Sequence, residues 1–479
     1  MTRTCEGKFE NMYTNRINKN CVSYCLETVA FWLFCIIIID CAFSGSGHWF
    51  RFGNLSLRMI TGLLSVIFAL PIFLRNLRNL KNSVGIIAVF CFLLLLVYAL
   101  FNGIDRKNPI SLIVLDLRCF FWLGLLIVSF SVINTLERVK IVLACLLFGG
   151  LFQVLIINYI NLMLLFDEAS FSNIFALNEK IELGLINPVG HGIFRIFFRS
   201  NLYMGISFFL ILYRFITNRN SINDSLLFFV PFIVFAILIS FTRSTYLSIG
   251  MSLILFSVLV GRERSLKVLK NLGFLLIFTL LVSLIHIITI QSISNKNILG
   301  FAIQRTMPTM FIQTPLDFLV IDATVFLPNK DNDEPLKQSE DDHSGYLLAT
   351  EKSDKFRITT KSELCNLIKL HPIMGNGLGS AIPSRGEGTN EYFILDLIAK
   401  MGVLGLLIFI FPSFLMLYRI LTNAYSDQLL MITLFAGLSS FFIASYFNPY
   451  MNSALGLTYY SVIMAIERYL LAKPKISPM

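Results

Sequence analysis

Apolar stretches of about 20 residues recur along the chain and are separated by short polar segments. A helix that crosses the hydrocarbon core of a bilayer needs about 20 apolar residues, and stretches of that length are too long for buried strands. The pattern therefore predicts an all-α polytopic membrane protein with about 12 transmembrane helices, over residues 22–43, 57–74, 84–102, 111–133, 139–166, 201–217, 225–241, 244–260, 268–290, 392–418, 427–446 and 453–472.

The distribution of Lys and Arg predicts the orientation of these helices, because short cytoplasmic loops collect basic residues. If the N-terminus is cytoplasmic, the inner segments hold most of the basic residues, for example Arg75, Arg78, Lys81, Arg262, Arg264, Lys473 and Lys475. The outer loops hold fewer, among them Arg51, Arg58, Arg106 and Lys107. We therefore expect both termini in the cytoplasm. The first span lacks a convincing cleavage site, and we expect it to be retained as an anchor.

Composition and charge narrow the class of protein. Hydrophobic residues make up 56% and charged residues 14% of the 479 residues, which excludes a water-soluble domain of this length. The formal net charge of +10 is explained by the basic inner segments, so a nucleic-acid partner is not required. The nine cysteines contain no CxxC and no paired spacing, so neither a disulfide framework nor a metal site is indicated.

Two longer outer segments, residues 167–200 and 291–391, interrupt the helices. They divide the chain into 1–290 with helices 1–9, a large periplasmic loop over 291–391, and 392–479 with helices 10–12. Within the large loop, the acidic, Pro-containing stretch 328–343 predicts a loop, and the apolar spacing of 359–370 predicts an amphipathic helix. The glycines Gly375, Gly377 and Gly379 predict a tight turn rather than a nucleotide-binding loop, because no strand precedes them.

Five arginines lie in or beside the membrane on the outer side or within a span, where topology does not require them: Arg118, Arg195, Arg199, Arg243 and Arg357. Charge at that depth is costly and is therefore a functional candidate. We expect Arg195 and Arg199, four residues apart, to share one helical face. A local pair with Asp116 is the alternative explanation for Arg118, and anchoring at the interface is the alternative for Arg195, Arg199 and Arg243. For Arg357 the alternative is an ordinary position in a polar loop. Since the guanidinium group binds phosphate with several donors, these arginines predict a site for a lipid-linked diphosphate.

The outer segments also hold possible general bases, namely His191, His343, His371, Glu387, Glu391 and Asp396. Their spacing matches neither a Ser/His/Asp arrangement nor a set of metal ligands, so no hydrolase is indicated. Each of them also fits an ordinary solvated surface residue.

Several segments resemble the O-antigen polymerase and O-antigen ligase superfamily of bacterial envelope glycan assembly. SFTRSTYLSIG (240–250) looks like the family's Ser-Arg-small segment at the start of a helix. KFRITTKSELCNLIKLHPIMGNGLGS (355–380) looks like its run of an Arg, a helix, a His or x-Pro and Gly-x-Gly-x-Gly. NEYFILDLIAKMGVLGLLIF (390–409) resembles the segment after the large loop, with Gly402 and Gly405 in the usual Gly-x-x-Gly place. A large outer loop late in a chain of about a dozen helices is also the family's layout.

The resemblance implies a membrane-embedded glycosyltransferase with a GT-C-like fold. Such an enzyme moves a glycan from an undecaprenyl diphosphate carrier and uses no metal, cofactor or nucleotide sugar. Arg243 and Arg357 match the family's diphosphate-binding arginines, and Arg195 and Arg199 match more loosely.

One departure from the family bears on the reaction. The ligases typically carry a His-Asn pair before the helix that follows the large loop, whereas this chain has Thr389-Asn390 followed by Glu391. The difference favours a polymerase over a ligase with a lipid A core acceptor, and it makes Glu391 the first candidate base, ahead of His343 and Asp396. A transporter or flippase is the alternative of a different class. Its signature would be similar halves and charges deep in several spans, and the sequence indicates neither.

The prediction is therefore a polymerase of O-antigen or a related surface polysaccharide in lipopolysaccharide assembly. It would lie in the bacterial inner membrane and act at the periplasmic face. Its expected partners are an undecaprenyl-diphosphate-linked oligosaccharide, membrane lipid, a chain-length regulator and a flippase.

Overall fold

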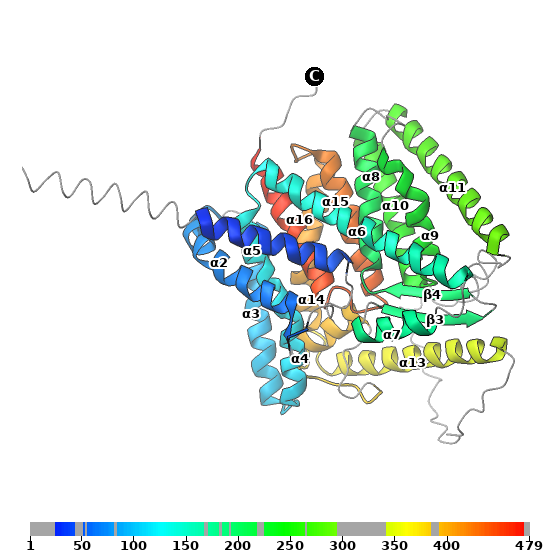
Figure 1. Ribbon diagram of the computed structural model, residues 1–479. Helices are drawn as coiled ribbons and strands as arrows, with labels where there is room; N and C mark the ends of the chain where they lie inside the picture. Colours follow the sequence, from blue (N-terminus) through cyan, green and yellow to red (C-terminus); the bar gives the residue numbers. More distant parts are fainter. Residues whose placement is uncertain are drawn as a thin grey trace, which may run out of the picture.

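A computed structural model gives the fold of the chain (Figure 1). It describes residues 24–43, 51–52, 55–80, 84–166, 171–181, 184–190, 193–217, 225–263, 266–294, 342–384 and 392–473. Each predicted span coincides with one helix or with two or three helices that follow one another directly. They are the first helix (Tyr24–Phe43), α2 (Leu57–Leu80), α3 (Val84–Asp105), α4 (Ile110–Phe120) with η1 (Phe121–Gly124) and α5 (Leu125–Val132), α6 (Leu136–Phe166), α8 (Asn201–Thr217), η3 (Ser225–Phe229) with α9 (Val230–Ile239), α10 (Arg243–Glu263), α11 (Leu266–Ser294), α14 (Phe393–Leu421), α15 (Gln428–Ser445) and α16 (Ala454–Ala472).

Eight of the helices in the described ranges are long and apolar enough to cross a bilayer. Three further apolar stretches, at Val89–Asp105 within α3, at Asn201–Thr217 and at Ser225–Ile239, are shorter, with 10–17 residues each. The helix α16 is more polar because it carries Glu467 and Arg468. The chain is thus an all-α polytopic membrane protein with about eight helices that can span a membrane, and the four further crossings stay predictions.

Two antiparallel hairpins interrupt the helices, and the sequence pattern did not predict them. The first joins β1 (Arg51–Phe52) to β2 (Leu55–Ser56), and the second joins β3 (Gly184–Gly190) to β4 (Ile193–Phe198). In the second hairpin Asn187 pairs with Arg195. The β4 sequence IFRIFF is β-branched and aromatic apart from its Arg, a composition that favours a strand over a helix.

The helices and strands of the two predicted outer segments lie together at one end of the molecule (Figure 1). They are α7 (Phe171–Ile181), the β3–β4 hairpin and α13 (Asp342–Leu370). The predicted amphipathic helix is formed, but it begins at Asp342 rather than at residue 359. Its Leu364 side chain is buried against Leu395 and Ala399 of α14. Most of the predicted 328–343 loop lies outside the described residues.

The helices α8, α15 and α16 form the centre of the bundle. Of the apolar segment of α15, 78% is buried inside the protein, against 28% for α11, which lies at the periphery. Tyr203 of α8 and Tyr459 of α16 are fully buried and pack edge to face, with ring centroids 6.1 Å apart. Their hydroxyls donate hydrogen bonds to the carbonyls of Leu455 (2.8 Å) and Leu434 (3.0 Å). Buried tyrosines satisfied in this way fix how the central helices face one another.

The predicted tight turn over residues 375–379 lies between α3 and α14. Its three glycines have φ between +75° and +84°, a region that favours glycine. The Gly377 N–H donates to the carbonyl of Lys400 in α14 at 3.0 Å. A Cβ atom on Gly377 would lie 2.3 Å from the backbone nitrogen of Gly103 in α3. Close approach of two backbones therefore accounts for the glycine at this position.

The helix α14 is broken at Gly402, which has φ +71° and ψ 179°. The N–H groups of Val403 and Leu404, at the break, donate to the carbonyls of Pro372 (2.8 Å) and Ile373 (3.3 Å). The segment that follows α13 thus supplies the acceptors that a continuous helix would have supplied.

Candidate functional site

Arg195 and Arg199 do not share a helical face, contrary to the sequence prediction. Arg195 lies within β4, and Arg199 lies in the turn that follows it. The Arg199 side chain is exposed, whereas Arg195 is partly buried. The strand, with its period of two residues, replaces the helix that the i,i+4 argument assumed.

The Arg195 side chain docks on the connection between α9 and α10. Its Nε donates to the carbonyl of Ser240 at 3.2 Å, and its Nη2 donates to Oγ1 of Thr242 at 3.3 Å. Its guanidinium carbon lies 5.4 Å from the centroid of the Phe197 ring. Thr242 immediately precedes Arg243, the first residue of α10. The hairpin and α10 therefore bring Arg195 and Arg243 to the same turn.

Arg357, in α13, lies near Arg195 as well. The pKa of the Arg195 guanidinium is lowered, first by burial and then by the nearby positive charges of Arg357 and Arg243. The Tyr392 hydroxyl, at the start of α14, donates to the backbone carbonyl of Arg357 at 3.3 Å. We call Arg195, Arg243 and Arg357 the arginine cluster. Its members come from three segments that are far apart in the sequence.

Arg199 lies near Tyr450, and its positive charge affects the Tyr450 phenol. Tyr450 is a buried residue in the connection between α15 and α16. Burial raises the pKa of the Tyr450 phenol, because it disfavours the anion. The nearby Thr245 hydroxyl and the positive charges of Arg195 and Arg199 act in the opposite direction. Four of the five predicted arginines therefore lie near Arg195 or Tyr450, namely Arg195, Arg199, Arg243 and Arg357.

Sequence reasoning missed the α15–α16 connection, residues 446–453. The Asn448 Nδ2 donates to Oγ of Ser244 at 2.8 Å, next to Arg243. The Tyr446 ring packs edge to face with Tyr392, with centroids 6.3 Å apart. Aromatic and amide residues between two apolar helices are typical of an ordinary interfacial turn. The density of aromatics in YFNPY was the only signal in the sequence.

Arg118 lies away from these interactions, on an exposed face of α4, where its Nη2 contacts the sulfur of Met59 at 3.6 Å. The alternative explanation for Arg118, a local pair with Asp116, is wrong, because that pair is not formed. Asp116 instead accepts hydrogen bonds from Lys400 Nζ and from the Gly379 N–H, both at 2.7 Å. Residues i and i+2 point to different sides of a helix, so Asp116 faces the bundle while Arg118 faces outward.

Lys400 also pairs with Asp396, one turn earlier on α14, at 2.7 Å. The side chains of Lys400, Asp116 and Asp396 are only 4–6% exposed, and we call them the buried ion triad. It corrects the inference that the spans lack deep charges. Because Asp396 is paired inside the bundle, it cannot approach an acceptor in this arrangement, which argues against its predicted role as base.

Of the other predicted bases, the structure describes the position of only some. His371 is described and exposed, directly after α13. His343 lies in α13, but its side chain is outside the described part. Four further residues lie outside the described ranges, namely His191, Glu387, Thr389 and Glu391. The choice of base therefore stays a prediction.

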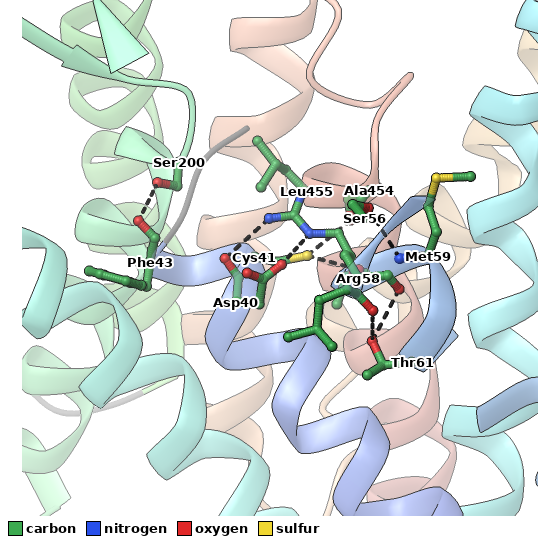
Figure 2. A network of polar contacts seen from close by, with 12 residues as sticks. Asp40, Cys41, Phe43, Ser56, Arg58, Met59, Thr61, Ser200, Ala454 and Leu455 are labelled. Atoms are coloured by element: carbon green, nitrogen blue, oxygen red, sulfur yellow. Dashed lines mark hydrogen bonds and ion pairs between the residues drawn. The ribbon is translucent and has the colours of Figure 1, made fainter. Parts of the chain in front are cut away.

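A second polar network joins the first helix, α2 and the start of α8 beside the N-terminus of α16 (Figure 2). Arg58, only 5% exposed, donates to the Asp40 carboxylate and, through Nη2, to the Asp40 carbonyl at 3.2 Å. Ser200, which follows Arg199, donates to the carbonyl of Phe43 at 3.4 Å. The network therefore fixes the segment that carries Arg199 to the first helix.

Within the described ranges, no three His, Cys, Asp or Glu residues are grouped so that they could hold a metal ion. Comparisons with protein families, with curated proteins and with solved structures gave no match. The functional assignment therefore depends on the site geometry and on the resemblance in the sequence.

Proposed function

We propose that the chain polymerises O-antigen or a related bacterial surface polysaccharide at the periplasmic face of the inner membrane. The donor is a growing glycan on undecaprenyl diphosphate, and the acceptor is the non-reducing sugar of a carrier-linked repeat unit. The resemblance at residues 240–250 and 355–407 supports the class of enzyme. The arginine cluster supports the class of donor.

In the proposed reaction, a hydroxyl of the acceptor sugar attacks the anomeric carbon of the donor. The new glycosidic bond forms while the bond from that carbon to the diphosphate oxygen breaks, and undecaprenyl diphosphate leaves. A general base, with Glu391 the first candidate, takes the proton of the hydroxyl. The arginines stabilise the negative charge that develops on the leaving diphosphate, an electrostatic contribution that is often the largest in such reactions.

The observation that carries the proposal is the meeting of Arg195, Arg243 and Arg357. Burial of Arg195 is the main cause of its lowered pKa, and the nearby positive charges of Arg357 and Arg243 act in the same direction, because like charges oppose one another. A ligand with several negative charges would relieve this opposition, and a diphosphate offers many acceptor oxygens to guanidinium groups. Arg243 begins α10, where the helix dipole opposes a cation and favours an anion.

Deletion of the gene tests the proposal. Because ligation would continue while polymerisation stopped, we expect lipid A core that carries a single repeat unit. Lipopolysaccharide on a gel reports this directly, and the wild-type gene on a plasmid should restore the ladder of long chains.

Two other outcomes would reject the polymerase. Core without any repeat unit, together with long chains accumulating on the carrier, would identify a ligase. Repeat units retained on the cytoplasmic face would identify a flippase.

A further inference from the structure

The α15–α16 connection, residues 446–453, lies between the elements that carry the arginine cluster. On one side Asn448 is hydrogen-bonded to Ser244, the neighbour of Arg243. On the other side the Tyr446 ring contacts Tyr392, whose hydroxyl donates to the backbone of Arg357. A ligand held by the cluster would therefore lie beside this connection.

The chemistry of the connection differs from that of the cluster. Its sequence, YFNPYMNS, contains no charged residue. Tyr446 and Phe447 are partly exposed, whereas Tyr450 and Asn452 are buried. The partly exposed Asn448 adds a polar side chain beside these rings. Aromatic faces with a few polar groups suit a neutral ligand that has both C–H faces and hydroxyls.

We propose that residues 446–453 form a saccharide subsite, which contacts the sugar ring attached to the diphosphate of the donor. This inference rests on the proposed function, since it is the arginine cluster that would hold the diphosphate. An aromatic ring, that of the partly exposed Tyr446 or Phe447, covers the C–H face of the sugar, and the side-chain amide of Asn448 bonds to its hydroxyls. The arginines bind the charged part of the donor, and the connection binds the neutral part.

The connection is rigid enough to act as a preformed subsite. The Tyr450 N–H donates to the carbonyl of Asn448 at 2.9 Å, and the Met451 N–H donates to Oγ of Ser445 at 3.0 Å. The Ser453 hydroxyl donates to the carbonyl of Tyr450 at 2.6 Å. A segment held by such bonds loses little conformational freedom when a ligand binds.

Binding of two lipids to the full-length protein in detergent tests the subsite. One probe is undecaprenyl diphosphate, and the other is the carrier-linked repeat unit extracted from the deletion strain. Phe447→Leu removes the flat ring but keeps an apolar side chain. We expect roughly tenfold weaker binding of the repeat-unit lipid and unchanged binding of undecaprenyl diphosphate. Phe414→Leu, on an exposed face of α14, is the matched control and should change neither.

Each other result has a definite meaning. An equal loss for both lipids, or a loss for neither, overturns the subsite while leaving the arginine cluster intact. Failure of the wild-type protein to bind undecaprenyl diphosphate overturns the proposed function itself. If Phe447→Leu does not accumulate in membranes, Tyr446→Leu takes its place in the same comparison, and the same results decide.

Discussion

The ammonium nitrogen of Lys400 lies 2.7 Å from Oδ1 of Asp116, although 284 residues separate them in the sequence. Asp396 completes the buried ion triad from the same helix as Lys400. The second oxygen of Asp116 accepts from the Gly379 N–H. The triad thus ties α4, α14 and the glycine turn together inside the bundle.

Lys400→Met should unfold or strongly destabilise the protein, because it leaves two buried carboxylates without their cation. Breaking a buried pair in this way costs about 3–5 kcal/mol. Thermal unfolding of the detergent-solubilised protein and its level in membranes measure the effect. Lys369→Met, at an exposed position on α13, is the control and should change neither. Normal stability of Lys400→Met would contradict the structural role of the triad.

Arg243→Lys should leave a folded protein that has lost most activity. Lysine keeps the charge but loses the planar set of donors, and one preorganised donor contributes roughly a hundredfold to the rate. Polymer length on a gel, beside the expression level, gives the result. Arg118→Lys is the matched control, because Arg118 is exposed on α4 and contacts Met59.

Wild-type polymer at normal expression would remove Arg243 from the site. If Arg243→Lys lowers both the polymer length and the expression level, then the same measurements on Arg195→Lys and Arg357→Lys test the site.

Inorganic pyrophosphate should raise the melting temperature of the wild-type protein. Burial, and after it the positive charges of Arg357 and Arg243, lower the pKa of Arg195, and a bound anion would act in the opposite direction by favouring the charged guanidinium. A ligand at 100 times its Kd stabilises the native state by about 2.7 kcal/mol. Arg357→Gln should weaken the response. An equal response to sodium chloride at matched ionic strength would show screening rather than binding.

Gly377→Ala should destabilise the protein by about 1–3 kcal/mol or more, because its Cβ would lie 2.3 Å from a backbone nitrogen of Gly103 at φ +84°. Gly250→Ala is the matched control, since nothing lies within 4 Å of the added atom. Within α10 the control should be neutral or slightly stabilising. Equal melting temperatures for the two variants would mean that the turn does not need its glycine.

Glu391→Gln should lower polymer synthesis by about a hundredfold or more at normal expression, as expected for loss of a general base. Asp396→Asn should instead lower the amount of folded protein, since Asp396 belongs to the buried ion triad. Polymer per unit of membrane protein separates the two effects. The reverse pattern would return the role of base to Asp396.

The helices were predictable because each is encoded by a local run of apolar residues. The turn at 375–379 was also predictable, because alternating glycines indicate close backbone contact. Sequence reasoning failed where tertiary contacts decide. The period of β4 was misread as a helix around Arg195, and the partner of Asp116 was sought nearby rather than at Lys400. Tyr450 and Asn448 carry no motif, so only the packing of α15 and α16 places them beside the arginines.

The break at Gly402 also constrains how the protein assembles. In hydrocarbon each unsatisfied backbone group costs several kcal/mol, and the N–H groups of Val403 and Leu404 find their acceptors at Pro372 and Ile373. The second half of α14 therefore cannot settle stably among lipids by itself. We therefore expect the second half of α14 to become stable in the membrane together with the docking of the turn at Pro372 and Ile373, as one cooperative event.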